Sequence, residues 1–349
     1  MVDLRDLEEI KKHDPNNVYE SLDMLPDQCV DIWELSKKVV FLENLKNVKN
    51  IVLCAMGGSM YGAYVLRALY HDSLKVPLVS LGDYRLPGFA DQNTLVILSS
   101  YSGDTEEPLN CVRTALEKKL LLVALTNGGK ALDIVRQNNI PAIVFDQKYN
   151  PSQQPRFGTG YMALGTIGMF NNLGYISVSD DEVSQAILTI RKNEDQIKGR
   201  SIELAQKIHN SIPVIIAAEH LNGNAHIIRN QINETAKSFS AYSELPELNH
   251  HLMEGLKNPQ DKKLKVLFIG SDLYSYKLRR RYELTKGVIE KNDVSWVEFK
   301  PFSNGKLSQV LEVLSFGGYL SFYLAMLYGQ DPSVIPWVDY FKKQLSRKS

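Results

Sequence analysis

The chain has 349 residues, which is enough for two domains. Hydrophobic residues make up 44% of the chain and charged residues 23%, the usual balance of a globular protein in water. Forty basic side chains balance forty acidic ones, so no excess of positive charge indicates nucleic acid or an anionic membrane surface as a partner. A phosphorylated small molecule stays compatible with this neutrality, because it needs only a local cluster of donors.

The cysteines and the apolar runs indicate the compartment. Cys29, Cys54 and Cys111 lie far apart, and their spacing fits neither a metal site nor a disulfide framework. This usage favours a reducing compartment, so we expect a cytoplasmic protein. The charged N-terminus is unlike a signal peptide. The longest apolar run, residues 314–328, is shorter than the roughly 20 residues that cross a bilayer, so we expect no membrane span.

Residues 1–49 are expected to form a helical arm that packs on the first domain. Apolar residues such as Ile32 and Leu35 recur there at helical spacing. Breaks in the helical pattern are expected near Pro15 and Pro26, because proline interrupts a helix.

A strand, a glycine turn and a helix are expected within residues 51–70. The apolar run IVLCA predicts a buried strand, MGGS (56–59) predicts a tight turn, and helical periodicity follows. Gly57 and Gly58 leave backbone N–H groups uncovered, and Ser59 stands at the N-cap position of a helix whose start carries partial positive charge. These features suit a phosphate group. A capped turn without a ligand is an equally good interpretation of this stretch alone.

Strands and helices alternate through the first half of the chain. The expected strands are nearly continuous apolar runs at residues 51–55, 76–81, 94–99, 120–125 and 142–145. Such strands, separated by helices, predict a doubly wound parallel sheet that is covered on both faces. Ligands of these sheets bind at the carboxyl ends of the strands.

The third expected strand leads into a loop rich in hydroxyl groups, SSYSGDT (99–105). Ser100, Ser102 and Thr105, with the backbone N–H groups of the helix that follows, suit a phosphate without a metal. Both candidate loops follow strands of one sheet and should open on the same edge, which strengthens the phosphate hypothesis. The alternative is a Ser/Thr-rich turn in which Thr105 or Asp104 caps the helix.

A long loop, residues 148–160, follows the last strand of the first half, and Arg156 is its central cation. Loops of this length in a compact domain tend to be functional. An arginine there is suited to fixing an anion or a developing enediolate. The alternative is an ordinary surface arginine. A helix over residues 161–173 is expected to close the domain.

The second half repeats this architecture. Residues 178–192 predict a charged amphipathic helix, and residues 193–201 are expected to connect the domains. The further expected strands are residues 213–217, 265–269 and 294–299, and the further helices are about 224–237, 274–291, 307–328 and a final one from Trp337. The stretch SFSAYSELPELNHH is expected to be a loop. We divide the chain into an arm (1–49) and two domains (50–192 and 193–349).

Six short stretches form an ordered set. They are MGGS (56–59), SSYSGDT (99–105), QPRFGTGY (154–161), QINETAK (231–237), PELNHH (246–251) and LSFGGYLSFYLAMLYGQDP (314–332). In this order they resemble the bifunctional phosphoglucose/phosphomannose isomerases, which are built from two sugar-isomerase (SIS) domains. Each motif is moderately specific, but the ordered set spans nearly the whole chain. The resemblance implies two SIS-type domains with flavodoxin-like layers, preceded by a helical arm and followed by a C-terminal helix.

The activity that this resemblance implies is the isomerisation of a hexose 6-phosphate. Glucose 6-phosphate, and also mannose 6-phosphate, would interconvert with fructose 6-phosphate through an enediol, with no cofactor and no metal. The implied phosphate site comprises Gly57, Gly58, Ser59, Ser100, Ser102 and Thr105.

The resemblance also implies the catalytic residues. Arg156 would steady the enediol, and Glu234 would be the base that moves a proton between C1 and C2. His250 would assist ring opening, which needs a group that titrates near neutrality. This histidine reaches the site from the partner subunit in the family, so a homodimer is implied. Lys306 is the best match to a further lysine of the site.

One motif departs from the family pattern. Family members usually read PELNHNE, whereas here His251 and Leu252 follow His250, and the next acid is Glu254. His251 therefore remains an alternative for the ring-opening group.

Two other functions compete with a hexose phosphate isomerase. A regulatory SIS protein would bind sugar phosphates without chemistry, but the retained Glu234 and His250 argue against it. An isomerase of an amino sugar or pentose phosphate is the second, and the two-domain length argues against that. A helical glutamate such as Glu234 is, without the motif set, more often a solvated side chain.

Overall fold

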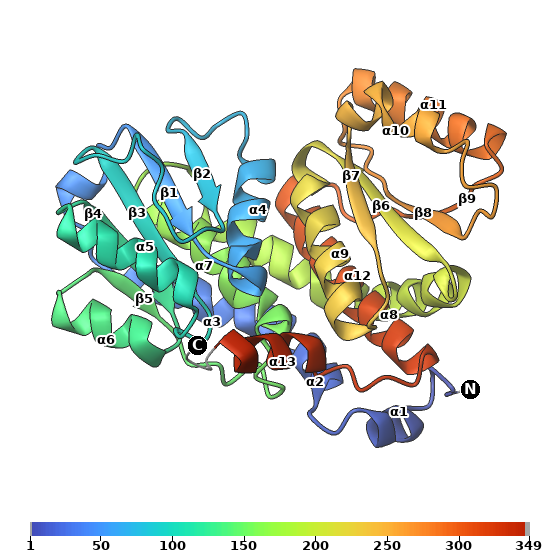
Figure 1. Ribbon diagram of the computed structural model, residues 1–349, viewed down its shortest axis with the longest axis horizontal. Helices are drawn as coiled ribbons and strands as arrows, with labels where there is room; N and C mark the ends of the chain where they lie inside the picture. The colour runs from blue at the N-terminus through green and yellow to red at the C-terminus, as the bar shows by residue number, and fades with distance from the viewer. Residues whose placement is uncertain (1, 346–349) are drawn as a thin grey trace.

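The computed structural model describes residues 2–345 of the chain. Two parallel sheets stand side by side (Figure 1). The first has the order β2-β1-β3-β4-β5, with bounds β1 Asn50–Cys54, β2 Leu78–Leu81, β3 Thr94–Ser100, β4 Leu121–Thr126 and β5 Ala142–Val144. The second has the order β7-β6-β8-β9, with bounds β6 Ile212–Ala218, β7 Ala241–Leu245, β8 Leu264–Ile269 and β9 Ser295–Phe299.

Helices precede, cover and follow these sheets. The arm holds α1 Leu7–His13, α2 Val18–Asp23, α3 Leu25–Lys38 and the short η1 Glu43–Leu45. The first domain holds η2 Gly57–Met60, α4 Tyr61–Leu69, α5 Glu106–Glu117, α6 Gly129–Gln137, η3 Pro155–Phe157 and α7 Thr159–Asn172. The rest are α8 Asp180–Ile208, η4 Glu219–Leu221, α9 Asn222–Thr235, η5 Glu247–His250, α10 Leu252–Gly255, α11 Tyr276–Lys291, α12 Lys306–Leu327 and α13 Pro336–Leu345.

The first sheet is buried on both faces, which explains its continuous apolar strands. Successive residues of β1 point to opposite faces. Ile51 and Leu53 belong to one core cluster with α3, α4 and α7, and Val52 and Cys54 belong to a second cluster with α5 and α6. The predicted class, α/β with two parallel sheets, is confirmed, and each of the eight predicted strands is present.

One strand was missed in the sequence. The residues Ala241–Leu245, which we expected to lie in a loop, form β7, so that prediction was wrong. β7 is an edge strand, and its residues are mostly half-exposed, so it lacks the apolar run that marks the other strands.

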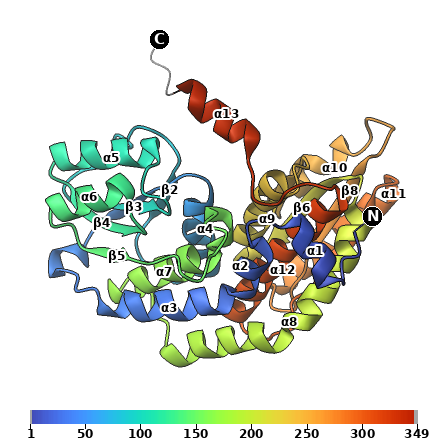
Figure 2. The same ribbon diagram turned by 90° about the horizontal axis from the view of Figure 1, so that it is seen from below.

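The segment expected to connect the domains is helical. Residues 193–201 lie inside α8, a single helix of 29 residues that leads from the first domain to β6 of the second, so the expected connection is part of a continuous helix. The division that we placed after residue 192 falls within this helix. Figure 2 shows α8 running along both halves of the molecule.

Among the described residues, α12 is the one helix long and apolar enough, by length and composition, to cross a membrane. Its most apolar window is 94% buried inside the fold, where α12 packs against α8 and α9. Burial of this kind is typical of the central helix of a folded core, so burial rather than length accounts for its apolar sequence.

The two domains repeat one local structure, a strand followed by a short turn and a helix. In the first domain β1, η2 and α4 make this unit, and Gly57 has a φ of 51°. In the second domain β6, η4 and α9 make it, and Glu219 stands at the corresponding place with a φ of 45°. The carboxylate of Glu219 accepts the backbone N–H of Ser275, the N-cap of α11, at 3.1 and 3.2 Å.

Candidate active site

A cleft of about 1290 Å³ lies where the carboxyl edge of the first sheet meets the amino edge of the second. Its walls are the turn after β1, the loop after β3, residues 151–156, the end of α9 and residues 333–345. Figure 2 shows α13 projecting from the junction of the two domains, so this helix forms the outer wall.

The glycine turn forms the floor of the cleft at the end of β1. Gly57 has a positive φ, which glycine adopts without strain. A Cβ on Gly58 would lie 3.0 Å from the carbonyl carbon of Pro155, so glycine is needed for the long loop to pack here. The hydroxyl of Ser59 accepts the backbone N–H of Tyr101 at 2.8 Å, and its own proton remains available to a ligand.

The loop after β3 brings hydroxyl groups to the same cleft. Ser102 and Thr105 line it, and Thr105 is the N-cap of α5 but makes no side-chain cap hydrogen bond. The start of α5 is therefore open to an anion. Ser100 is fully buried behind the loop, where its Oγ accepts the N–H of Gly103 at 3.1 Å, and it does not line the cleft.

Three acidic residues, Asp104, Glu106 and Glu107, also line the cleft. Their charges disfavour an anion at long range. A phosphate bound here is consequently held by individual N–H and O–H donors rather than by an excess of positive charge.

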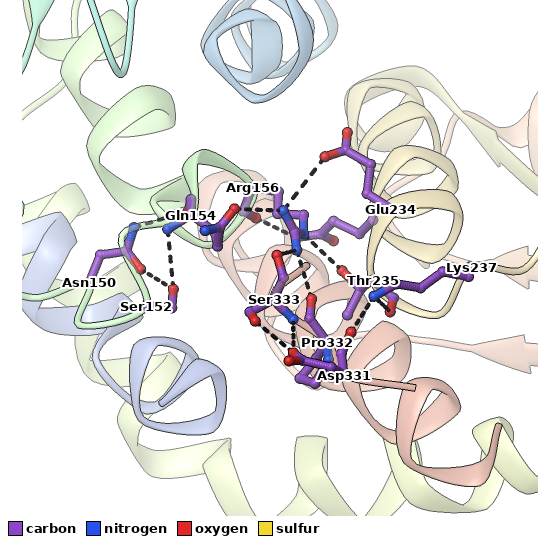
Figure 3. Close-up of polar contacts among 11 residues, drawn as sticks. Asn150, Ser152, Gln154, Arg156, Glu234, Thr235, Lys237, Asp331, Pro332 and Ser333 are labelled. Atoms are coloured by element: carbon purple, nitrogen blue, oxygen red, sulfur yellow. Dashed lines mark hydrogen bonds and ion pairs between the residues drawn. The ribbon is translucent and has the colours of Figure 1, made fainter. Parts of the chain in front are cut away.

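Arg156 joins the long loop to the C-terminal segment. Only 2% of its surface is exposed. Four of its N–H donors bind protein oxygens: Thr235 Oγ1 at 3.3 Å, Gln154 Oε1 at 3.1 Å, and the carbonyls of Pro332 and Ser333 at 2.7 and 2.6 Å (Figure 3). A guanidinium has five such donors. The remaining one is on Nη1, the nitrogen that lies 3.8 Å from Glu234 Oε2.

Glu234 is the carboxylate of the cleft that lies nearest to Arg156. It lies one residue before the end of α9, and its side chain points away from residues 331–333 (Figure 3). Burial raises the pKa of Glu234, while the charges of Arg156, Lys342 and Lys237 act in the opposite direction. A carboxylate with a raised pKa is suited to accepting a proton near neutrality.

The lysine that lines the cleft is Lys342, on α13. Lys306, which the sequence suggested, is an exposed residue at the start of α12 and is not among the lining residues. It follows β9, so it lies at the carboxyl edge of the second sheet, and its charge helps to lower the pKa of His220 after the larger effect of burial. The cleft is at the opposite edge.

His250 also lies away from the cleft. It follows the carboxyl end of β7, whereas α9 returns the chain so that Glu234 lies near the amino end of β7. A strand of five residues separates the two ends, a distance of roughly 15 Å. His250 is exposed, and the neighbouring His251 pairs with Glu247 at 2.6 Å. Neither histidine lines the cleft within one chain.

Several residues of the site gave no sequence signal that we recognised. The carbonyls of Pro332 and Ser333 are backbone groups, which no side-chain pattern reports. Lys342 stands in the final amphipathic helix as one of two adjacent lysines, and the basic end of that helix was its only sign. Gln154 and Thr235 stand inside the motifs QPRFGTGY and QINETAK, where the sequence analysis assigned roles only to Arg156 and Glu234.

The fold and the cleft define a class of protein. Two doubly wound parallel sheets, two loops at one sheet edge that offer N–H and hydroxyl groups, and a half-buried carboxylate opposite them are typical of SIS proteins that bind phosphorylated sugars.

Comparisons with known proteins agree with this class. Residues 197–345 match the model of the bacterial phospho-glucose isomerase C-terminal SIS domain. A bifunctional phosphoglucose/phosphomannose isomerase of Caldicellulosiruptor bescii is 30% identical over 345 residues, covering 94% of this chain and 99% of the relative. The enzyme of the same name from Aquifex aeolicus is 28% identical, covering 87% of this chain and 93% of the relative.

A solved structure has the same fold. A hypothetical protein of Thermus thermophilus superimposes with a TM-score of 0.72 at 16% identity, over 96% of this chain and 92% of that one. Because the Caldicellulosiruptor relative matches at 30% identity over almost its whole length, this chain belongs to the bifunctional phosphoglucose/phosphomannose isomerase family. It is a sugar-phosphate isomerase.

Proposed function

We propose that this enzyme is a cytoplasmic, cofactor-independent isomerase that interconverts glucose 6-phosphate, and also mannose 6-phosphate, with fructose 6-phosphate. The observation that carries the proposal is a half-buried carboxylate, Glu234, whose Oε2 lies 3.8 Å from Nη1 of Arg156, in a cleft whose far wall is suited to phosphate. The relatives that match most of the chain carry the names of both activities.

The phosphate group is assigned to the loops of the first domain. Ser59, Ser102 and Thr105 offer hydroxyl donors there, and the backbone of Gly57 and Gly58 comes close without side chains in the way. Ser100 would act indirectly, since its hydroxyl holds the N–H of Gly103 and so shapes the loop. Binding at the phosphate, away from the reacting carbons, orients the sugar for the chemical step.

Proton transfer is assigned to Glu234. In the open-chain aldose, the carboxylate of Glu234 takes the proton from C2, a double bond forms between C1 and C2, and the carbonyl oxygen at C1 becomes an oxyanion, which gives an enediolate. A proton then passes from the hydroxyl on C2 to the oxygen on C1. As the C2 oxygen re-forms a carbonyl, the carboxyl group of Glu234 returns its proton to C1, which completes the ketose. The remaining N–H of Arg156 steadies the developing oxyanion, and the charge of Lys342 adds to it. We assign the role of the family's lysine to Lys342 rather than to Lys306, because Lys342 lines the cleft.

Ring opening is assigned to His250 of a second chain in a homodimer. Glu234 and His250 lie at opposite edges of the second sheet, so one chain cannot present both side chains to one sugar. A two-fold related pair of chains can present Glu234 of one and His250 of the other to each cleft. His251 remains the alternative for this role.

Turnover of fructose 6-phosphate tests the proposal. Glucose 6-phosphate and mannose 6-phosphate are both quantified as products, in D₂O as well as in H₂O, for wild type and for Glu234→Gln. We expect both aldoses from wild type and a loss of at least about 1000-fold in kcat for the variant. Deuterium at C2 of the aldose products would show that the proton delivered to C2 comes from a group, such as the carboxyl group of Glu234, that exchanges its proton with solvent.

Glu117→Gln is the matched control, because Glu117 is an exposed residue at the end of α5 that does not line the cleft. It should keep wild-type turnover. Binding of the sugar phosphates without any turnover by wild type would instead support a regulatory protein. Turnover of an amino sugar or pentose phosphate alone would reassign the substrate.

A further inference from the structure

Tyr61 is the first residue of α4, directly after the glycine turn, and none of its surface is exposed. Among the described residues no acceptor takes the proton of its hydroxyl, while the side chain of Asn230 acts on the hydroxyl oxygen as a donor. Buried polar groups are nearly always paired in folded proteins, so a buried O–H without an acceptor calls for an explanation. Phenylalanine would fill the same space without burying a polar group.

The surroundings of this hydroxyl come from the second domain. Helix α4 packs against α9, and Gly223 of α9 allows the close approach, since a Cβ there would lie 2.4 Å from the carbonyl oxygen of Tyr64. Asn230 and Glu234 follow on the same face of α9, one turn apart. In Figure 3 the carboxylate of Glu234 points toward the blue helix, α4.

The charges that act on the hydroxyl are those of the active site. Burial raises the pKa of Tyr61 well above its usual value, so the group stays a neutral O–H donor. Glu234 raises this pKa further and Arg156 lowers it, and they are the charged groups that influence it most; the hydrogen bond from the side chain of Asn230 also lowers it. Tyr61 does not line the cleft, so it cannot reach a bound sugar directly.

We propose that Tyr61 is a positioning residue whose hydroxyl donates a hydrogen bond to the carboxylate of Glu234 in the working enzyme. The inference rests on the proposed role of Glu234 as the base. A donor on one carboxylate oxygen fixes the rotation of the side chain and leaves the other oxygen facing the sugar. Catalytic hydrogen bonds are often long in ligand-free structures and tighten only when substrate is bound.

The same hydrogen bond tunes the carboxyl group. A donor to the charged form favours that form, so Tyr61 would lower the pKa of Glu234 against the effect of burial. The other groups that face Glu234 are Arg156 from η3, Lys342 from α13 and Lys237 just after α9, and all three are cations that act in the same direction.

Tyr61→Phe tests the proposal, with Tyr70→Phe as the matched control. Tyr70 is the C-cap of α4, at the far end from the cleft, and its hydroxyl is also buried without an acceptor among the described residues. For Tyr61→Phe we expect kcat to fall by about tenfold or more with KM within about twofold of wild type. The acidic limb of the pH profile of kcat/KM should move to higher pH, because the carboxylate has lost a donor. Tyr70→Phe should match wild type in kcat, in KM and in the position of the acidic limb.

The pH profile distinguishes a positioning role of Tyr61 at Glu234 from a purely structural role. If Tyr61→Phe changes the melting temperature while the acidic limb stays in place, the proposal is wrong, and it is equally wrong if the two variants behave alike. The pKa of Glu234 is also read by ¹³C NMR of labelled glutamate, with the signal assigned by its loss in Glu234→Gln. It should rise in Tyr61→Phe. This measurement decides the proposal even if wild type turns over no sugar phosphate, which would count against the proposed function alone.

Discussion

Arg156 contacts more parts of the cleft wall than any other side chain described above. Its guanidinium binds the long loop through Gln154, the end of α9 through Thr235, and the C-terminal segment through two carbonyls. Lys237 binds the carbonyl of Asp331 in the same segment. The arginine is thus mainly an anchor that keeps both domains and the C-terminal segment together, and it has one donor left for chemistry.

Lys342 and Lys306 give a direct test of the lysine assignment. We expect Lys342→Met to lower kcat/KM by about 100-fold, because it removes a cation that lines the cleft and acts on Glu234. Lys306→Met should cost less than about threefold. Steady-state kinetics with fructose 6-phosphate measure both. A larger loss for Lys306→Met would show that the start of α12 enters the cleft of a partner chain.

The sequence predicted the residues of the site unevenly. Gly57, Ser59, Ser102 and Thr105 were predictable because loops after neighbouring parallel strands share one edge. Lys306 was predicted to belong to the site, but within one chain it does not line the cleft, whereas Lys342 does. The path of α12 and α13, which decides this, cannot be predicted from local periodicity. Glu234 and His250 are only sixteen residues apart in the sequence. Because β7 runs between them, they lie at opposite ends of a strand, and the sequence analysis did not predict this strand.

At the scale of elements, continuous apolar runs predicted the buried strands. β7 has no such run, so the sequence analysis missed it. The edge strand is half-exposed, and Pro246 and the polar residues around it are typical of loops. Helix α8 is polar over much of its length and only one side is buried, so residues 193–201 look like a connecting segment in the sequence. Gly199 lies within them, but a single glycine lowers helix stability without ending the helix.

The packing of α4, α9 and β7 includes a stack of three rings. His226 of α9 lies between Tyr64 of α4 and Tyr242 of β7, with centroid distances of 4.0 and 4.4 Å. Arg229 Nη2 lies 2.6 Å from His226 Nε2, so the ring accepts this bond in its neutral form. Burial, followed by the charges of Arg229 and Arg67, lowers the pKa of His226 to about 4.

This stack predicts a loss of stability in mild acid. The unfolded chain binds the proton of His226 near pH 6.5, whereas the folded chain binds it only near pH 4, so stability is complete above about pH 6.5 and falls as the pH is lowered. Allowing for the partial exposure of the ring, we expect about 1 kcal/mol lost at pH 5. Urea unfolding at pH 7.5 and pH 5 measures it.

His226→Phe is the control, because phenylalanine keeps the stacked ring and does not titrate. The free energy of unfolding of His226→Phe should fall between pH 7.5 and pH 5 by about 1 kcal/mol less than that of wild type. Equal losses in the two proteins would mean that His226 is not responsible.

At the scale of the molecule, the two domains meet with opposite sheet edges. The carboxyl edge of the first sheet and the amino edge of the second border the cleft, while the carboxyl edge of the second, with His250, faces elsewhere (Figure 1). The two-domain architecture was predictable from the alternation of strands and helices. This mutual orientation was not, because it depends on tertiary packing along α8 and α12.

The proposed sharing of each site between two chains predicts complementation between inactive variants. Glu234→Gln and His250→Ala are each expected to be nearly inactive alone. Mixing them one to one, with dissociation and reassociation, should restore about a quarter of wild-type activity, since half of the dimers are mixed and each has one complete site. No recovery after verified exchange of subunits would mean that each cleft is built from one chain.

Glu219 marks the main difference between the two strand–turn–helix units of the molecule. It occupies the place in the second domain that Gly57 occupies in the first, and its carboxylate accepts the N–H at the start of α11 that a phosphate would otherwise need. The second domain thus supplies an internal anion of its own, covalently tethered and present at every moment. A phosphate at this place in the second domain would meet that carboxylate, so the two similar halves of the chain are not equivalent as sites for an anion.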